Sequence, residues 1–153
     1  MNNGSVVESA VDPVSRPRPR ILVVEDNYLM AEVVCDFLRE CGMEPVGPAC
    51  DLDAGLLLAW EQDVAGAVLD INLCGRPVFP ICSVLAHRGL PFIFLSAYAP
   101  GMAVPGAYRA VPYVEKPFTD ERLRNALEVL VRRRGPVPLD ESGEFPRSAS
   151  SLC

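Results

Sequence analysis

The sequence predicts one α/β domain, in which a parallel sheet carries helices on both faces. Three observations support this fold class. Short apolar runs alternate with segments of helical periodicity between residues 20 and 134. The runs are apolar throughout, which is typical of strands buried on both faces of a parallel sheet. With 153 residues, 50% of them hydrophobic and 22% charged, the chain has the size and composition of a single packed domain.

The first strand and helix are predicted at the start of this domain. Residues 21–24 form a continuous β-prone run, and Asn27 can cap the helix that follows. Gly42 is a suitable stop for that helix. The apolar stripe that we expect to be buried comprises Leu29, Met30, Val33, Val34, Phe37 and Leu38.

The next three elements are a weak strand, a helix and a strong strand. A strand near residues 43–47 is disturbed by Pro45 and Pro48. Asp51 can cap the second helix, and residues 67–69 form the third strand. The inward face of the second helix is predicted to comprise Leu52, Leu56, Ala59 and Trp60.

A third helix and a fourth strand follow. The helix is expected from about residue 78 to residue 87, with Pro77 and Pro80 at its start and Gly89 after its end. The fourth strand covers residues 92–95. In the connection 97–110, four helix-breaking residues predict a loop or at most one or two turns in place of a helix: Pro100, Gly101, Pro105 and Gly106.

The last strand and helix complete the domain. The fifth strand is predicted over residues 111–114, and Thr119 can cap the final helix. Its buried stripe is expected to comprise Leu123, Ala126, Leu127, Leu130 and Val131. Residues 1–19 and 135–153 are rich in Pro, Ser, Arg or Gly, and we expect flexible tails on either side of a domain at 20–134.

Composition narrows the possible partners. A net charge of −6 argues against a general nucleic-acid binder, so no DNA is expected as a partner. No apolar run approaches the roughly 18 residues of a membrane span, and residues 1–20 lack the apolar segment of a secretory signal. We therefore expect a cytoplasmic protein that does not bind a membrane. The six cysteines form no C-x-x-C pair and are interpreted as small apolar side chains.

Polar residues follow the predicted strands at their carboxyl ends, where doubly wound sheets bind ligands. These residues are Glu25, Asp26, Asp70, Ser96 and Lys116. Clustered carboxylates repel one another and need a cation or a proton. Mg²⁺, or Mn²⁺ in its place, prefers such oxygen ligands. Phosphoryl transfer needs an anionic nucleophile, a positive charge and hydroxyl donors, and all three are present in this set.

Each residue alone has a simpler interpretation. An acidic pair such as Glu25 and Asp26 is more often part of a solvated loop, and an Asp after a strand is as often a helix cap. The combination of four such positions at one edge of a single sheet is what favours a functional site.

Four segments of the sequence together resemble the signature of bacterial two-component receiver domains, over about residues 20–133. They are residues 21–27, residues 68–73, Ser96, and residues 113–118. The resemblance implies a flavodoxin-like five-stranded sheet with order 2-1-3-4-5, and a histidine kinase or phosphotransfer protein as phosphoryl donor.

The resemblance also implies a role for each matching residue. Asp70 is the expected phosphoacceptor, and Lys116 the expected partner of the phosphoryl group. Asp26, Asp70 and the Asn72 backbone carbonyl are the expected metal ligands, with Glu25 acting through metal-bound water. Ser96 and Tyr113 occupy the switch positions, and a cis bond before Pro117 would aim Lys116 inward.

A narrower resemblance concerns single-domain receivers of alpha-proteobacteria, the "FAT GUY" group, in which the fourth strand ends Phe-Ala-Thr-Gly-Tyr. This chain has Phe94, Leu95, Ser96, Ala97 and Tyr98 at those positions. It keeps the Phe, a hydroxyl and the Tyr, and it departs from the pattern at the Gly. The group often has a short or missing fourth helix.

Sequence alone therefore predicts a stand-alone, Mg-dependent response regulator that signals through an unknown downstream protein. We expect no enzymatic activity beyond its own phosphorylation and dephosphorylation. A phosphorylation-independent adaptor with the same fold is the alternative. A phosphatase that uses Asp70 would need a general acid where Asn72 stands, and a flavin carrier would need a phosphate loop where Glu25–Asn27 stands.

Overall fold

Five parallel strands form one sheet in the order β2-β1-β3-β6-β7. The strands are β1 (Arg20–Val24), β2 (Glu44–Ala49), β3 (Gly66–Leu69), β6 (Phe92–Ser96) and β7 (Tyr113–Glu115). The order is the predicted 2-1-3-4-5, with β6 and β7 as the fourth and fifth strands. The computed structural model describes residues 17–97 and 104–133, so most of both predicted tails, and Tyr98 with them, lie outside the described residues.

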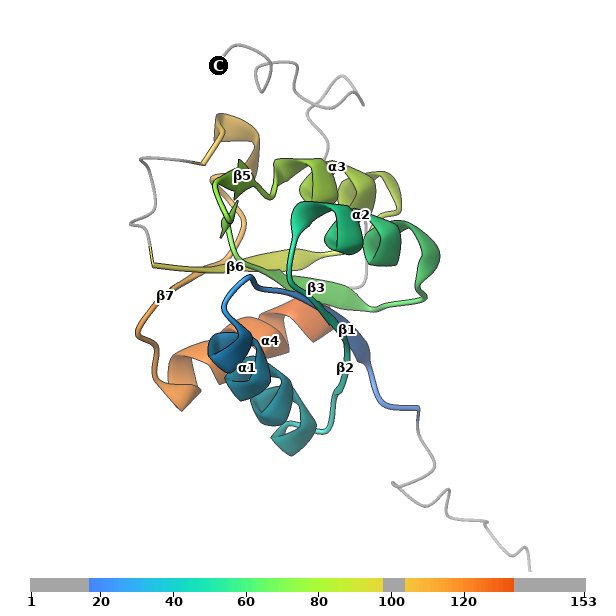
Figure 1. Cartoon of the computed structure of the whole chain (residues 1–153). Coiled ribbons are helices and arrows are strands. Elements are labelled where there is room, and N and C mark those ends of the chain that lie inside the picture. The colour runs from blue at the N-terminus through green and yellow to red at the C-terminus, as the bar shows by residue number, and fades with distance from the viewer. Residues whose placement is uncertain (1–16, 98–103, 134–153) are drawn as a thin grey trace, which may run out of the picture.

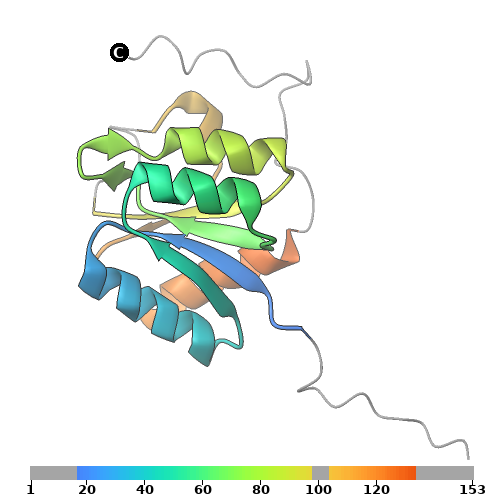
Figure 2. The same ribbon diagram turned by 45° about the vertical axis from the view of Figure 1, so that its right-hand side comes forward.

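Four α-helices in the described residues cover the two faces of the sheet. They are α1 (Tyr28–Glu40), α2 (Leu52–Glu61), α3 (Phe79–His87) and α4 (Asp120–Arg132). Figures 1 and 2 show α2 and α3 on one face, with α1 and α4 on the other. Each face has its own buried apolar cluster, which makes the fold doubly wound as predicted. Within the described residues, no helix combines the length and the apolar character that crossing a bilayer would require.

Three helix caps are confirmed by hydrogen bonds. The side-chain oxygens of Asn27, Asp51 and Thr119 each accept a bond from a backbone amide three residues further on, at 3.1, 2.7 and 3.3 Å respectively. Each bond satisfies an amide that has no partner inside its helix. Gly42 follows the end of α1 with a φ of 76°, which a glycine adopts without strain.

The connection between β6 and β7 is held by one aromatic side chain. Within its described residues, the only helical segment is the 3₁₀ turn η2 (Gly106–Tyr108), as the Pro and Gly content predicted. The Tyr108 ring is buried against Phe79, Phe92 and Phe94, with ring centroids 5.7 to 6.4 Å away. Its hydroxyl lies 3.4 Å from Ser83 Oγ.

Three apolar side chains that were predicted to be buried are exposed. Leu29 and Val33, at 72% and 53% exposure, lie on the side of α1 opposite the residues that it buries. Apolar residues occur on both sides of this helix, so periodicity did not identify the buried face. Trp60 is 61% exposed and stacks on His87, with ring centroids 6.4 Å apart. The α2 face that packs inward is lined by Leu52, Gly55 and Ala59.

A short hairpin between β3 and α3 was not predicted. Its strands are β4 (Asn72–Leu73) and β5 (Arg76–Pro77), which pair antiparallel. Cys74 and Gly75 form the two-residue turn, with φ values of 53° and 86°. Positive φ at both positions is the signature of a type I′ turn. The turn also exposes Cys74, and Cys50 is exposed as well, so these two cysteines are not the apolar core residues that were predicted. Cys35 and Cys82 are buried and Cys41 packs half-buried against the core, whereas Cys153 lies outside the described residues.

Candidate functional site

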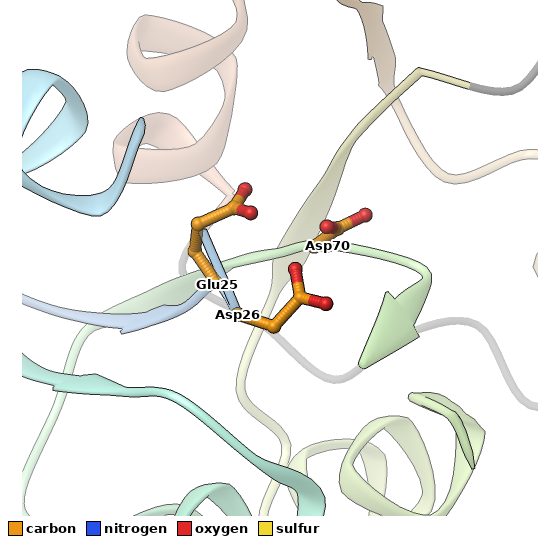
Figure 3. A group of neighbouring side chains, drawn as sticks. All are labelled: Glu25, Asp26 and Asp70. Atoms are coloured by element: carbon orange, nitrogen blue, oxygen red, sulfur yellow. The ribbon is translucent and has the colours of Figure 1, made fainter. Parts of the chain in front are cut away.

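The residues predicted to carry chemistry meet at the carboxyl edge of the sheet. Glu25 and Asp26 follow β1, and Asp70 follows β3. Because these strands are parallel neighbours, their ends bring the side chains together. Oxygen atoms of all three carboxyl groups lie within 4.8 Å of one another, and Figure 3 shows the groups facing a common centre.

Lys116 places a positive charge inside this acidic cluster. Its Nζ lies 2.5 Å from Glu25 Oε2 and 3.4 Å from Asp70 Oδ2. The three side chains are only 14%, 3% and 10% exposed, so water screens the ion pairs weakly. The bond between Lys116 and Pro117 is cis, as the resemblance implied.

Glu25 has an unusual protonation equilibrium. Its pKa is raised from 4.5 to about 7, chiefly by burial, which outweighs the opposing hydrogen bond from Lys116, and the charge of Asp70 acts in the same direction as burial. The backbone amide of Asn27 also donates to Glu25 Oε1, at 3.1 Å. Glu25 is therefore a carboxyl group that exchanges a proton near neutral pH.

The pKa of Asp26 is shifted in the opposite direction to that of Glu25, although burial raises the pKa of both groups. Burial raises its pKa, but hydrogen bonds, chiefly from the backbone and thiol of Cys74, outweigh that effect and the net pKa is lowered. The Cys74 amide donates to Asp26 Oδ2 at 3.0 Å, and the thiol lies 3.5 Å from the same oxygen. Asp26 therefore stays ionised at neutral pH.

The donor set fits a hard divalent cation. Three carboxyl groups converge against the single ammonium of Lys116, so the cluster carries excess negative charge when all are ionised. Asp26, Asp70 and Glu25 offer the oxygen atoms that Mg²⁺ or Mn²⁺ prefers. Asn72 lies at the start of β4, and its side-chain Oδ1 accepts a bond of 2.6 Å from the Gly75 amide. The backbone carbonyl of Asn72 is the further ligand that the family resemblance implied.

Ser96 and Tyr113 lie beside this cluster. Ser96 is the last residue of β6 and is fully buried, and its backbone oxygen accepts bonds from the Lys116 amide at 2.9 Å and the Tyr113 hydroxyl at 3.3 Å. Tyr113 is half-buried in β7, and burial is the main reason why its pKa is raised. The two predicted switch residues are therefore in contact with each other.

Sequence reasoning missed one residue of this site. Cys74 contacts Asp26 through two donors, whereas the sequence led us to interpret it, like the other cysteines, only as a small apolar side chain. The available signal was its place before Gly75, because an X-Gly pair between two short segments is typical of a hairpin turn. That signal is weak when the flanking strands are two residues long.

Comparisons with known proteins agree on one class of protein. No family model matches the chain. It is similar to the solution structure of SdrG from Sphingomonas melonis Fr1, with 32% identity and a TM-score of 0.65 over 74% of this chain and 97% of that one. The magnesium-containing receiver domain of the sensor histidine kinase PA1611 from Pseudomonas aeruginosa PAO1 has 22% identity and a TM-score of 0.64, over 76% of this chain and 99% of that one, which shows a shared fold.

Among curated relatives, the transcriptional regulatory protein PdtaR of Mycobacterium tuberculosis is 30% identical over 117 residues, or 74% of this chain. The chain spans 57% of the length of that relative.

Proposed function

This chain belongs to the family of response-regulator receiver domains, and from that premise we propose that it accepts a phosphoryl group on Asp70 and signals through protein contacts. The proposed donor is a sensor histidine kinase or a phosphotransfer protein, and the proposed cofactor is Mg²⁺. The setting that we propose is the cytoplasm, with the chain acting as a stand-alone regulator whose downstream partner is a protein.

One observation carries this proposal: the ammonium of Lys116 lies 3.4 Å from Asp70, inside a cluster of three buried or half-buried carboxyl groups. A solvated acidic loop, which is the simpler interpretation of Glu25 and Asp26, would not bury an ion pair at this depth. A carboxylate nucleophile beside a fixed positive charge is the arrangement that phosphoryl transfer requires.

The proposed reaction moves one phosphoryl group between two protein side chains. An Asp70 oxygen attacks the phosphorus of a phosphohistidine, the new P–O bond forms, and the P–N bond breaks with its electron pair returning to the imidazole. Lys116 pairs with the negative charge that moves onto Asp70. When bound, Mg²⁺ would neutralise charge on the phosphoryl oxygens, held by Asp26, Asp70 and the Asn72 carbonyl, with Glu25 acting through water.

The proposed output begins at Ser96 and Tyr113. The Tyr113 hydroxyl donates to the backbone of Ser96, so a shift of Ser96 toward a phosphoryl group would change the contact that holds the ring. Both residues adjoin the connection between β6 and β7, which begins at residue 97. We place the signalling surface on this connection together with β7 and α4.

The experiment that tests this proposal is intact mass spectrometry after incubation with acetyl phosphate, with and without Mg²⁺. We expect one added phosphoryl group that requires the metal and is absent from the Asp70→Ala variant. Asp53→Ala is a matched control, since Asp53 is an exposed carboxylate whose partner is Arg76. Labelling of wild type and Asp70→Ala to the same extent would contradict the proposal.

The alternative is an adaptor that works without phosphorylation. It would account for a wild-type chain that gains no phosphoryl group and shows no spectral response to beryllofluoride with Mg²⁺. The acidic cluster would then have no assigned role.

A further inference from the structure

The turn between β4 and β5 holds one oxygen of Asp26. The Cys74 amide and the Cys74 thiol both reach Asp26 Oδ2, at 3.0 and 3.5 Å. In Figure 3 the other Asp26 oxygen points toward the carboxyl groups of Glu25 and Asp70. We propose that the Cys74-Gly75 turn positions Asp26, so that one oxygen is anchored and the other is presented to the cation. This inference rests on the proposed function, because it assumes that Asp26 binds a metal.

The conformation of the turn directs the Cys74 amide toward Asp26 Oδ2. Leu73 pairs with Arg76, which leaves Cys74 and Gly75 as the two turn residues, both with positive φ. The Gly75 amide is bonded to Asn72 Oδ1 at 2.6 Å, and this bond closes the turn from within. The Cys74 amide therefore points out of the hairpin, toward the end of β1.

Cys74 occupies a conformation that non-glycine residues seldom adopt. Its φ is 53°, and it is the only non-glycine residue with positive φ in the described part of the chain. Backbone strain of this kind persists where the surroundings hold it in place, and it clusters at functional sites. Here the strained residue is the one that contacts Asp26.

Anchoring matters because a carboxylate on a single side chain can rotate. Partners in the outer shell fix the orientation of metal ligands, and their loss typically weakens metal affinity by about 10- to 100-fold. Asp26 is half-buried, and the two donors that reach its Oδ2 atom both come from Cys74 in the hairpin. Cys74 is thus a positioning residue that acts on the cation through Asp26.

The test compares two glycines that share a positive φ but differ in location. Gly75 and Gly42 have φ values of 86° and 76°, and an added Cβ would meet no atom within 4 Å at either one. Alanine at each position therefore imposes backbone strain without a steric clash. We expect Gly75→Ala to weaken Mg²⁺ binding about tenfold, measured by titrating amide NMR signals with MgCl₂. Gly42→Ala should lower the melting temperature by a similar amount and leave Mg²⁺ affinity unchanged.

A second pair of variants keeps the proposal falsifiable if Gly75→Ala fails to fold. Asn tolerates positive φ, so Cys74→Asn keeps the amide in place and loses only the thiol. We expect its Mg²⁺ affinity to stay within about threefold of wild type. The β-branched Cys74→Val is strained at this φ and should weaken binding about tenfold.

Hydrogen exchange in the metal-free protein distinguishes a positioning role of Cys74 from a general effect on the stability of the fold. In the metal-free protein the Cys74 amide should exchange slowly with solvent deuterium, and Asp26→Ala should speed that exchange at least tenfold. Fast exchange in wild type, or wild-type Mg²⁺ affinity in both Gly75→Ala and Cys74→Val, would overturn the inference. If wild type binds Mg²⁺ and is phosphorylated while these variants behave identically, only the positioning role fails. If wild type does neither, the proposed function itself fails.

Discussion

Lys116 is bonded more closely to Glu25 than to Asp70. The distance from Nζ is 2.5 Å to Glu25 Oε2 and 3.4 Å to Asp70 Oδ2. The charge that phosphoryl transfer needs beside Asp70 is thus shared with a buried glutamate, whose pKa is raised to about 7. Protonation of Glu25 is therefore expected to govern both the metal site and the stability of the fold.

Mg²⁺ affinity should increase with pH around neutrality. Burial raises the Glu25 pKa to about 7, so this group is mostly protonated at pH 6 and mostly ionised at pH 8. A proton on Glu25 removes a negative charge that would attract the cation. The apparent Mg²⁺ affinity should therefore rise about tenfold between these two pH values. Titration of amide NMR signals with MgCl₂ at each pH measures the change. The Glu25→Gln variant should lose this pH dependence, and an identical slope in that variant would contradict the assignment.

The free energy of unfolding should fall as pH rises from about 4.5 to 7. In this range folded Glu25 keeps a proton that the unfolded glutamate has released, because its pKa is about 7 in place of 4.5. The folded state then binds more protons, so stability decreases with increasing pH, by about 3 kcal/mol at most from this group.

Urea denaturation at a series of pH values would measure this contribution. In the Glu25→Gln variant, the free energy of unfolding should depend less steeply on pH over the same pH range. A variant curve that runs parallel to wild type would show that another group is responsible.

Arg88 should stabilise the fold from a position far from the site. Its Nη1 donates to the backbone oxygens of Ala59 and Gln62, at 2.5 and 2.9 Å, where α2 ends. The last carbonyls of a helix have no partner inside it, and α2 has no basic residue in its last turn. Arg88→Ala should cost about 2 kcal/mol in urea denaturation and leave phosphoryl labelling unchanged.

Arg39→Ala is the matched control for that substitution. Arg39 forms an exposed ion pair with Asp36, so its removal should cost less than about 0.5 kcal/mol. Equal losses for the two arginines would contradict the capping role of Arg88.

Tyr108 should be the main anchor of the connection between β6 and β7. Its ring packs against three aromatic side chains, whereas its hydroxyl has one distant partner, Ser83 Oγ at 3.4 Å. Tyr108→Ala should cost about 3 kcal/mol in urea denaturation, and Tyr108→Phe less than about 1 kcal/mol. If the two variants are equally destabilised, the hydroxyl and not the ring is the anchor.

Much of the site was predictable because strand ends can be located from the sequence. Glu25, Asp26, Asp70 and Lys116 each follow a strand whose apolar residues are buried, and parallel pairing then brings them to one edge. The caps at Asn27, Asp51 and Thr119 were equally accessible, since a cap bonds to an amide three residues away. The narrower "FAT GUY" resemblance stays a prediction, because Tyr98 lies outside the described residues.

The sequence by itself determined the helix starts and the strand ends that carry the site residues, because these depend on local periodicity and short-range hydrogen bonds. The strand order was implied by the resemblance to receiver domains. Tertiary structure alone decided that Trp60 faces solvent and that Gly55 lies on the inner face of α2, where Ile81 of α3 leaves no space for a Cβ atom. It also decided that Cys74 bonds to Asp26, 48 residues earlier in the chain. That contact depends on the direction of a strained two-residue turn, which no hydrophobic pattern encodes.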